Sequence, residues 1–275
     1  LSKLNILDDI NLISLAPNDF RSVIKALDAV KPNEIYYLAG LTSVGLSFEQ
    51  PVECMESISL GTLNFLEAIR FNRKKIKFFN AGSSECFGNT NKEIANEKTV
   101  FSPRSPYATA KATAFWMVSN YRESYNLFCC SGILGNHESP LRNKRFVTKK
   151  IVSGVWDIVK NKSNELRLGN LDTWRDWGWA PDYVEAMYLM MQSKVPEDYV
   201  IATGVTNSLK DFVSIAFKKF NLDHNKFVIS DEKLFRPSDI KYSYLDPSKI
   251  LRNLNWKSEK NLENIIDSMF EDLIN

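Results

Sequence analysis

The sequence is poor in glycine, and its glycines begin late in the chain. Eleven of the 275 residues are glycine, and none precedes Gly40. The first part of the chain therefore cannot form a glycine-rich turn that brings backbone amides close to a phosphate group. Long hydrophobic runs are also missing: no apolar stretch approaches the roughly 20 residues of a membrane-spanning helix, which excludes a membrane partner. The first eight residues lack the basic segment and apolar core of a secretory signal.

Cysteine and net charge are also low. None of the four cysteines forms a C-x-x-C pair, and the adjacent Cys129 and Cys130 are poorly placed to bridge each other. We therefore expect reduced thiols in a cytoplasmic protein. The formal net charge is +2, which gives no reason to expect nucleic acid or an acidic membrane as a partner.

In the first half of the chain, short apolar segments alternate with segments of helical periodicity. Strands are predicted at residues 10–14, 34–39, 76–81 and 127–134, and helices at 18–30, 52–70 and 106–125. This alternation predicts a doubly wound, parallel α/β sheet. The second half is less regular, with helices predicted at 147–159, 182–192, 209–220 and 262–274 and strands at 199–203 and 241–245. It predicts a smaller mixed α/β region packed over the first.

A tyrosine and a lysine lie four residues apart in the segment S-P-Y-A-T-A-K. On the predicted helix, this spacing places Tyr107 and Lys111 on one face. An ammonium group beside a phenol favours the phenolate, so we expect Lys111 to lower the pKa of Tyr107. Tyr107 would then take a proton from a substrate hydroxyl near neutral pH. Taken alone, the spacing is more often a solvated pair on a surface helix.

The segment A-G-S-S-E-C-F-G directly follows the strand predicted at residues 76–81. Doubly wound sheets bind their ligands at this carboxyl end of the strands. Ser83 is therefore a candidate to hydrogen-bond a sugar hydroxyl, and Glu85 is a candidate acid or base. An alternative remains open at this point, in which Ser83 caps a helix and Glu85 lies near its N-terminus.

These two segments carry a resemblance to a known family. A-G-S-S-E-C-F-G followed by F-S-P-R-S-P-Y-A-T-A-K resembles the extended short-chain dehydrogenase/reductases, and among them the GDP-mannose 4,6-dehydratases. Further matches follow in the same order: L-A-G-L-T-S-V, G-I-L-G-N-H-E-S-P, R-F-V-T-K-K-I, L-G-N-L-D-T-W-R-D-W-G, D-Y-V-E-A-M and F-R-P-S-D-I. The resemblance covers nearly the whole chain. It implies a Rossmann-like fold that lacks its N-terminal strand and phosphate loop.

The resemblance also implies a reaction and a cofactor. Members of the family use NADP, although NAD is not excluded for this sequence. Tyr107 would deprotonate the sugar 4-hydroxyl, with Ser83 close to that hydroxyl. Glu85 would remove the C5 proton and help to expel the C6 hydroxyl as water. Lys111 would hold the nicotinamide ribose, and the product would be a 4-keto-6-deoxy sugar.

Further positions match family contacts. The residues expected to touch the cofactor, besides Tyr107 and Lys111, are Leu38, Thr42, His137 and Arg142. Those expected to bind GDP-mannose or a related GDP-sugar are Asn136, Val147, Lys150, Arg175 and Arg236. Without the resemblance, His137 is equally an ordinary loop histidine, and Lys150 is equally part of a solvated helix face. A homodimer through the predicted helices at 52–70 and 106–125 is expected by analogy.

The expected organisation is a cofactor domain and a GDP-sugar region. The first comprises residues 1–135 plus about 174–203, and the second comprises about 136–173 plus 204–275. Because the phosphate loop is absent, the sequence is expected to be either a fragment or a divergent member that binds cofactor poorly or not at all. The main functional hypothesis is a GDP-mannose 4,6-dehydratase. The alternatives are a GDP-heptose dehydratase, a sugar-nucleotide epimerase or reductase, and a non-catalytic member that acts through subunit contacts.

Overall fold

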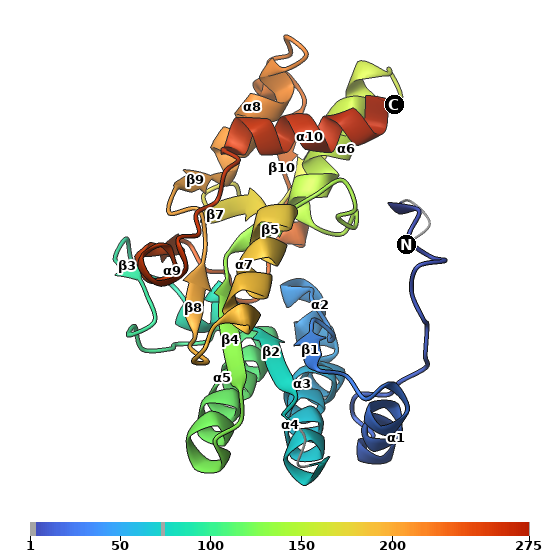
Figure 1. Ribbon diagram of the computed structural model, residues 1–275. Helices are drawn as coiled ribbons and strands as arrows, with labels where there is room; N and C mark the ends of the chain where they lie inside the picture. Colours follow the sequence, from blue (N-terminus) through green and yellow to red (C-terminus); the bar gives the residue numbers. More distant parts are fainter. Residues whose placement is uncertain (1–3, 73–74, 275) are drawn as a thin grey trace.

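The computed structural model describes residues 4–72 and 75–274. At its centre is an all-parallel, four-stranded sheet in the order β1-β2-β4-β8 (Figure 1). The strands are β1 (Glu34–Tyr37), β2 (Lys77–Ala81), β4 (Cys129–Leu134) and β8 (Tyr199–Ile201). The predicted parallel α/β sheet is confirmed, with each of these four strands close to its predicted position.

Helices cover both faces of this sheet. One face carries α1 (Phe20–Val30), α4 (Gly61–Asn72) and α5 (Pro106–Tyr125), and the other carries α7 (Ala180–Gln192). Successive residues of a strand point to opposite faces, so Phe78 packs with α1 and α4 whereas Phe79 packs with α7. Cys129 and Cys130 are separated in the same way. All four cysteines are buried free thiols, as expected.

The helix predicted at residues 52–70 is interrupted by one wide turn. It comprises α3 (Pro51–Met55), a π-helical turn at Glu56–Leu60 and then α4, and a short α2 (Val44–Glu49) precedes it. In the wide turn, the Ser59 hydroxyl donates to the backbone oxygen of Ala110 in α5 at 3.1 Å. This bond ties the helical stretch to the helix that carries Tyr107.

The strand predicted at residues 10–14 is wrong. This segment has no regular structure, and Leu12 and Ile13 are 68% and 54% exposed. Figure 1 shows this segment running apart from the sheet, on the side where β1 is the edge strand. An extended segment becomes a strand only when a neighbour pairs with its backbone, and among the described residues none pairs here.

The second half forms small sheets around a second core. The strand pairings are β5 (Asn136–Glu138) with β7 (Trp174–Trp179), β7 with β9 (Thr206–Ser208), β6 (Leu166–Leu168) with β10 (Val228–Ser230), and β3 (Ile94–Ala95) with β11 (Tyr244–Leu245). The helices are α6 (Val147–Val159), α8 (Leu209–Lys218), α9 (Ser248–Leu254) and α10 (Leu262–Ile274). Apolar side chains of α6, α8, α10 and β6 form one buried cluster. The mixed region is therefore as predicted, although the strand predicted at 241–245 is reduced to two residues.

Among residues 4–72 and 75–274, no helix has both the length and the apolar character needed to cross a bilayer.

Candidate active site

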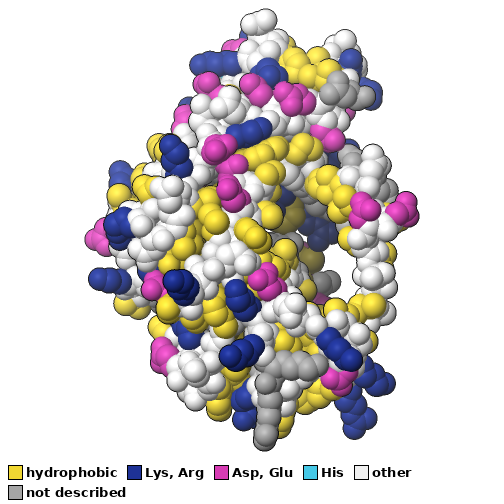
Figure 2. All heavy atoms as spheres, in the orientation of Figure 1, with side chains coloured by type: hydrophobic (Ala, Val, Ile, Leu, Met, Phe, Trp, Pro, Cys, Tyr) yellow, Lys and Arg dark blue, Asp and Glu magenta, His cyan; other side chains and the backbone are white. Residues whose placement is uncertain are grey.

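A cavity of about 550 Å³ opens at the carboxyl ends of β2 and β4 and extends to the second core. All thirteen predicted site residues line it: Leu38, Thr42, Ser83, Glu85, Tyr107, Lys111, Asn136, His137, Arg142, Val147, Lys150, Arg175 and Arg236. The space-filling view shows the molecule hollowed beside the N-terminal segment, with basic side chains visible inside (Figure 2). Residues far apart in the sequence, from Leu38 to Arg236, therefore line one cavity.

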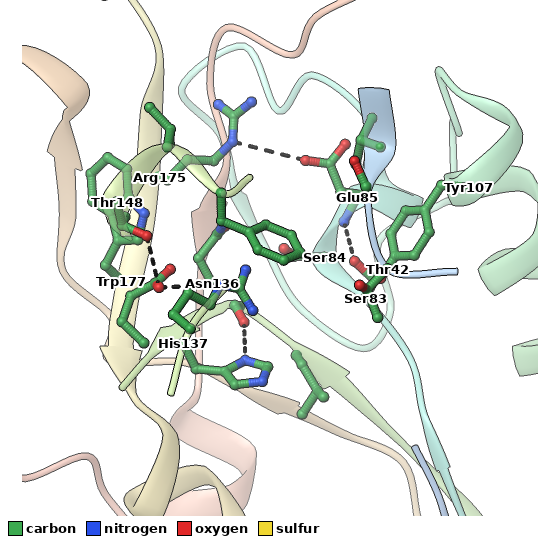
Figure 3. A pocket seen from close by; sticks show the side chains of 18 of the residues that line it. Thr42, Ser83, Ser84, Glu85, Tyr107, Asn136, His137, Thr148, Arg175 and Trp177 are labelled. Atoms are coloured by element: carbon green, nitrogen blue, oxygen red, sulfur yellow. Dashed lines mark hydrogen bonds and ion pairs between the residues drawn. The ribbon is translucent and has the colours of Figure 1, made fainter. Parts of the chain in front are cut away.

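Ser83 and Glu85 lie where the chain leaves β2. The Ser83 hydroxyl accepts a hydrogen bond from the Glu85 backbone N–H at 3.3 Å and begins a 3-10 turn at Ser84–Phe87. The capping role that the sequence left open is therefore real. It does not compete with a role in the cavity, because both side chains also line it and lie near Tyr107 (Figure 3).

Tyr107 and Lys111 are positioned by the start of α5. The Ser105 hydroxyl accepts from the Ala108 N–H at 3.1 Å, and Pro106 occupies the first helical position, where its missing N–H costs nothing. Tyr107 therefore lies in the first turn of the helix, with Lys111 one turn later. Both line the cavity, as the four-residue spacing predicted.

The expected effect of Lys111 on Tyr107 is wrong for this structure. Lys111 Nζ donates to the Ala81 backbone oxygen at 2.7 Å and lies 5.8 Å from the centre of the Tyr107 ring. Burial raises the pKa of Tyr107, and a hydrogen bond with Ser83 is the main effect in the other direction. Burial also lowers the pKa of Lys111 to about 8. Desolvation of the phenol outweighs the lysine because the ammonium group is turned towards a backbone carbonyl.

His137 is held as a neutral imidazole. Its Nδ1 lies 2.9 Å from the Gly135 carbonyl oxygen, so Nδ1 carries the proton and Nε2 is an acceptor. Burial lowers its pKa to about 4. Its ring packs at 4.9 Å on Tyr183, which in turn fits against Gly178, where a Cβ would lie 2.2 Å from the tyrosine ring. The glycine of R-D-W-G therefore makes room for the support of His137.

Sequence reasoning missed the role of Glu138, although it lies inside the N-H-E-S-P motif. Its carboxylate is 1% exposed, lies 3.2 Å from Arg142 Nε and accepts from the Thr148 hydroxyl at 2.8 Å. Burial raises the pKa of Glu138, while Arg142 acts to lower it. The Arg142 guanidinium also lies 3.7 Å from the centre of the Phe146 ring. Glu138 therefore joins a predicted cofactor residue to the start of α6.

The N-terminus of α6 faces the cavity. Its first residues, Val147 and Thr148, line the wall, and the residue before them, Phe146, makes no side-chain cap. Arg145 and Lys150 line the same wall. Backbone N–H groups at a helix start, together with two basic side chains, form a site suited to an anion such as a diphosphate. The sequence indicated Val147 and Lys150, and it missed Arg145.

A group of charged residues closes the opposite wall. Arg175 lies on β7. Its Nε is 3.9 Å from Glu85 Oε1, and its Nη2 is 3.4 Å from Asp239 Oδ1. Arg236 Nη1 lies 3.5 Å from the same Asp239 oxygen. Asp239 was not predicted, because an aspartate in a polar loop gives no periodic signal. Figure 3 shows Arg175 and Glu85 pointing toward each other across the cavity.

Solved structures with this fold include several nucleotide-sugar enzymes. UDP-glucose 4-epimerase from Thermus thermophilus, in complex with NAD, has a TM-score of 0.88 and 24% identity, covering 99% of this chain and 88% of that chain. dTDP-glucose 4,6-dehydratase from Bacillus anthracis, in complex with NAD, has a TM-score of 0.85 and 17% identity, covering 98% of this chain and 82% of that chain. At these identities the comparison establishes the fold.

The sequence comparisons identify the family. The family model for GDP-mannose 4,6 dehydratase matches residues 2–269. GDP-mannose 4,6 dehydratase 1 of Arabidopsis thaliana is 41% identical over 259 residues, which are 93% of this chain and 72% of that protein. The GDP-mannose 4,6-dehydratase of Vibrio cholerae is 38% identical over 285 residues, covering 93% and 77%. The chain belongs to the GDP-mannose 4,6-dehydratase family, as the motifs indicated.

Proposed function

We propose that this chain is a lyase that converts GDP-mannose into GDP-4-keto-6-deoxymannose and water. The observation that carries the proposal is the convergence of Ser83, Glu85, Tyr107 and Lys111, from two separate segments, on one cavity with an anion-binding helix start. An epimerase or reductase would have no need of a carboxylate beside the tyrosine. Glu85 therefore favours dehydration over these alternatives.

Tyr107 and Ser83 act at the sugar C4 hydroxyl. The Tyr107 oxygen accepts the proton of this hydroxyl as C4 is oxidised, and the Ser83 hydroxyl hydrogen-bonds both partners. Burial raises the pKa of Tyr107 and so keeps its hydroxyl protonated. Tyr107 therefore needs a nearby positive charge to become a base. Lys111, which lies one helical turn away, supplies that charge when its ammonium group turns from Ala81 towards the phenol.

Glu85 acts at C5 and C6. A ketone at C4 makes the C5 proton acidic, so the Glu85 carboxylate can remove it. The carboxylic acid then protonates the C6 hydroxyl, which leaves as water. The hydride taken from C4 would be returned to C6, and C5 would receive a proton from the Tyr107 hydroxyl, which holds the proton taken from the C4 hydroxyl. The overall change is then the loss of one water with no net redox change. One side chain therefore serves as base and acid in turn.

We further propose NADP as the cofactor, with NAD as the alternative. Three polar groups that line the cavity would suit a nicotinamide riboside: the Lys111 ammonium, the Thr42 hydroxyl and the acceptor Nε2 of His137. When bound, the nicotinamide supplies the acceptor and donor of hydride for the sugar. Arg142 also lines the cavity, where it pairs with Glu138. No glycine-rich turn precedes β1 in the described residues, in keeping with the sequence.

The other wall would bind the GDP-sugar. The N-terminus of α6, with Val147 and Lys150, is suited to the diphosphate, and Asn136 and Arg236 line the same cavity. The site would then lie between the cofactor region (residues 1–135 plus about 174–203) and the GDP-sugar region (about 136–173 plus 204–275). Buried free thiols support a cytoplasmic location for such an enzyme.

A homodimer is also proposed, through α3, the wide turn and α5. These elements contact one another, and several apolar side chains on them are exposed, namely Val52 (69%), Met55 (37%), Leu60 (39%) and Trp116 (61%). Such a surface is typical of a helix-to-helix interface. Measuring the mass of the protein in solution tests this proposal. Val52→Glu and Trp116→Glu should disrupt the dimer and lower that mass to the mass of the monomer. A monomeric wild type would refute it.

The direct test of the activity is incubation with GDP-mannose and NADP, with the nucleotide-sugar products identified by mass spectrometry. We expect a product lighter by one water. Glu85→Gln should abolish it while leaving the circular dichroism spectrum unchanged, and Glu123→Gln, on the outer part of α5, serves as a control that keeps activity. Retained cofactor with no product from the wild type would contradict the proposal.

A further inference from the structure

Glu138 is a buried carboxylate between two parts of the cavity wall. It ends β5, where it is in register with Trp179 of β7, and its side chain is 1% exposed. Its Oε2 lies 3.2 Å from Arg142 Nε and accepts from the Thr148 hydroxyl at 2.8 Å. A carboxylate taken out of water is stable as an anion only where such partners replace its hydration. One oxygen atom therefore contacts both a cation and the start of α6.

The loop at residues 139–146 is closed at its base by this carboxylate. Glu138 precedes the loop and Thr148 follows it closely, so their hydrogen bond joins its two ends. A second bond lies beside the first, in which Lys149 Nζ donates to the Pro140 carbonyl oxygen at 2.9 Å. The base of the loop is therefore held by two side chains.

Arg142 is held through its Nε, while its terminal nitrogens stay open to a ligand. The Nε is buried beside Glu138, and the guanidinium carbon lies 3.7 Å from the centre of the Phe146 ring. The Nε contact is not aligned as a hydrogen bond, so its attraction comes from charge. Within residues 4–72 and 75–274, neither Nη1 nor Nη2 has a hydrogen-bond partner. The side chain is 24% exposed and lines the cavity.

Thr148 fixes the start of α6 from the same carboxylate. The residue before the helix, Phe146, makes no side-chain cap, so the Thr148 hydroxyl provides a side-chain bond at the first turn in its place. The negative charge of Glu138 would repel a phosphate at this helix start, but the charge of Arg142 balances it. The first turn therefore keeps both its direction and its attraction for an anion.

We infer that Glu138 is a positioning residue with two separable tasks. Its charge holds Arg142, which is expected to contact the cofactor, and its oxygen holds Thr148 and with it the helix start that is proposed to bind the diphosphate. The inference rests on the proposed function, because that function assigns NADP and a GDP-sugar to this cavity. Glu138 acts through these two neighbours and takes no part in the proton transfers.

Two isosteric substitutions separate these tasks, with the dissociation constants of NADPH and GDP measured by fluorescence titration and calorimetry. Glu138→Gln keeps an oxygen that accepts from Thr148 but removes the charge that holds Arg142. We expect it to weaken NADPH binding by about tenfold and GDP binding by less than about threefold. Thr148→Val removes the hydroxyl and keeps the charge, so it should weaken GDP binding and spare NADPH, and Thr148→Ser should restore GDP binding. Equal changes for both ligands in Glu138→Gln overturn the inference.

A double-mutant cycle shows whether Glu138 acts through Arg142. In the Glu138→Gln background, Arg142→Gln should weaken NADPH binding by less than about threefold further, because Arg142 is already misplaced. Fully additive losses would refute positioning. Asp198→Asn is a matched control, since Asp198 is 12% exposed and pairs with Arg122 at 2.5 Å outside the cavity lining. It should lower stability in urea and leave both dissociation constants unchanged; weaker binding in this control would ascribe the loss in Glu138→Gln to stability, against the inference.

One measurement needs no ligand. In protein with isotope-labelled arginine, the buried Nε–H of Arg142 should exchange slowly with water, and its NMR signal is assigned by its loss in Arg142→Lys. Glu138→Gln should speed this exchange by about tenfold or more, and Thr148→Val should leave it slow. Unchanged exchange in Glu138→Gln overturns the inference.

The same measurement separates this inference from the proposed function. A wild type that binds neither NADPH nor GDP contradicts the proposed function, and the exchange rate then still decides whether Glu138 holds Arg142. If Glu138→Gln fails to fold, Thr148→Val carries the test, and unchanged GDP binding in that variant is the refuting result.

Discussion

The histidine that lines the cavity provides a sharp test of the site's electrostatics. Burial holds the pKa of His137 at about 4, below the ordinary value of 6.5. At a pH between these values, the unfolded chain binds a proton that the folded protein does not bind. Acid therefore favours the unfolded state.

The size of this effect follows from the two pKa values. The contribution of His137 to stability is fully present above pH 6.5 and is lost as the pH falls towards 4. The complete loss is about 3 kcal/mol, of which about 2 kcal/mol is reached near pH 5. His137→Gln keeps a donor for the Gly135 carbonyl but cannot titrate. Its free energy of unfolding should therefore fall by about 2 kcal/mol less than that of wild type on acidification.

Urea unfolding at about pH 7.5 and about pH 5 measures this difference. Asp176 provides a comparison of opposite sign, because burial raises its pKa from 3.8 to about 6, outweighing its bonds to Thr203 and Gly204. The stability it contributes is present at low pH and is lost as pH rises through 6. Asp176→Asn should thus make the loss on acidification larger by about 1 kcal/mol. Equal pH dependence in wild type and His137→Gln would refute a buried neutral imidazole.

Three further predictions concern the elements that position the site. Ser105→Ala removes the cap of α5 and should lower the free energy of unfolding in urea by about 1 kcal/mol; no change would mean that the bond to Ala108 contributes nothing. Gly178→Ala places a Cβ against the Tyr183 ring and should cost about 1–3 kcal/mol in the same assay, whereas unchanged stability would show that the ring can move away. Because the pKa of Lys111 is about 8, turnover should decline above about pH 8 as its charge is lost, and Lys111→Arg should shift this decline upward; an identical pH profile would show that Lys111 does not control it.

The sequence predicted the elements whose signals are local. The start of α5 is specified by Ser105 and Pro106, and β2 is a short apolar run whose neighbours Phe78 and Phe79 serve opposite faces. The segment at residues 10–14 has the same apolar character, but it forms no strand. A segment forms a strand only when a neighbouring strand pairs with its backbone, and the presence of that neighbour depends on the whole fold and not on the segment itself.

The sequence indicated which residues would line one cavity, but not how they contact one another. Motifs from separate segments brought all thirteen residues to one cavity. Several of these motifs end a strand or begin a helix at the same edge of the central sheet, as at β2 and α5. They gave no indication that Asp239 would anchor Arg175 or that Glu138 would hold Arg142. The expected lowering of the Tyr107 pKa was wrong because spacing along a helix fixes neighbours but not burial, and burial has the larger effect here.

In the proposed reaction, Glu85 and Tyr107 act together in one dehydration across C4, C5 and C6 of a GDP-sugar. The most direct measurement is the reaction of GDP-mannose and NADP in D₂O, followed by mass spectrometry and NMR of the product. The C5 proton leaves with the expelled water, and C5 is reprotonated from the Tyr107 hydroxyl, whose hydrogen exchanges with solvent. We therefore expect a product that has lost one water and carries deuterium at C5. A wild-type protein that retains cofactor but returns GDP-mannose unchanged, or a Glu85→Gln variant that still forms the product, would contradict it.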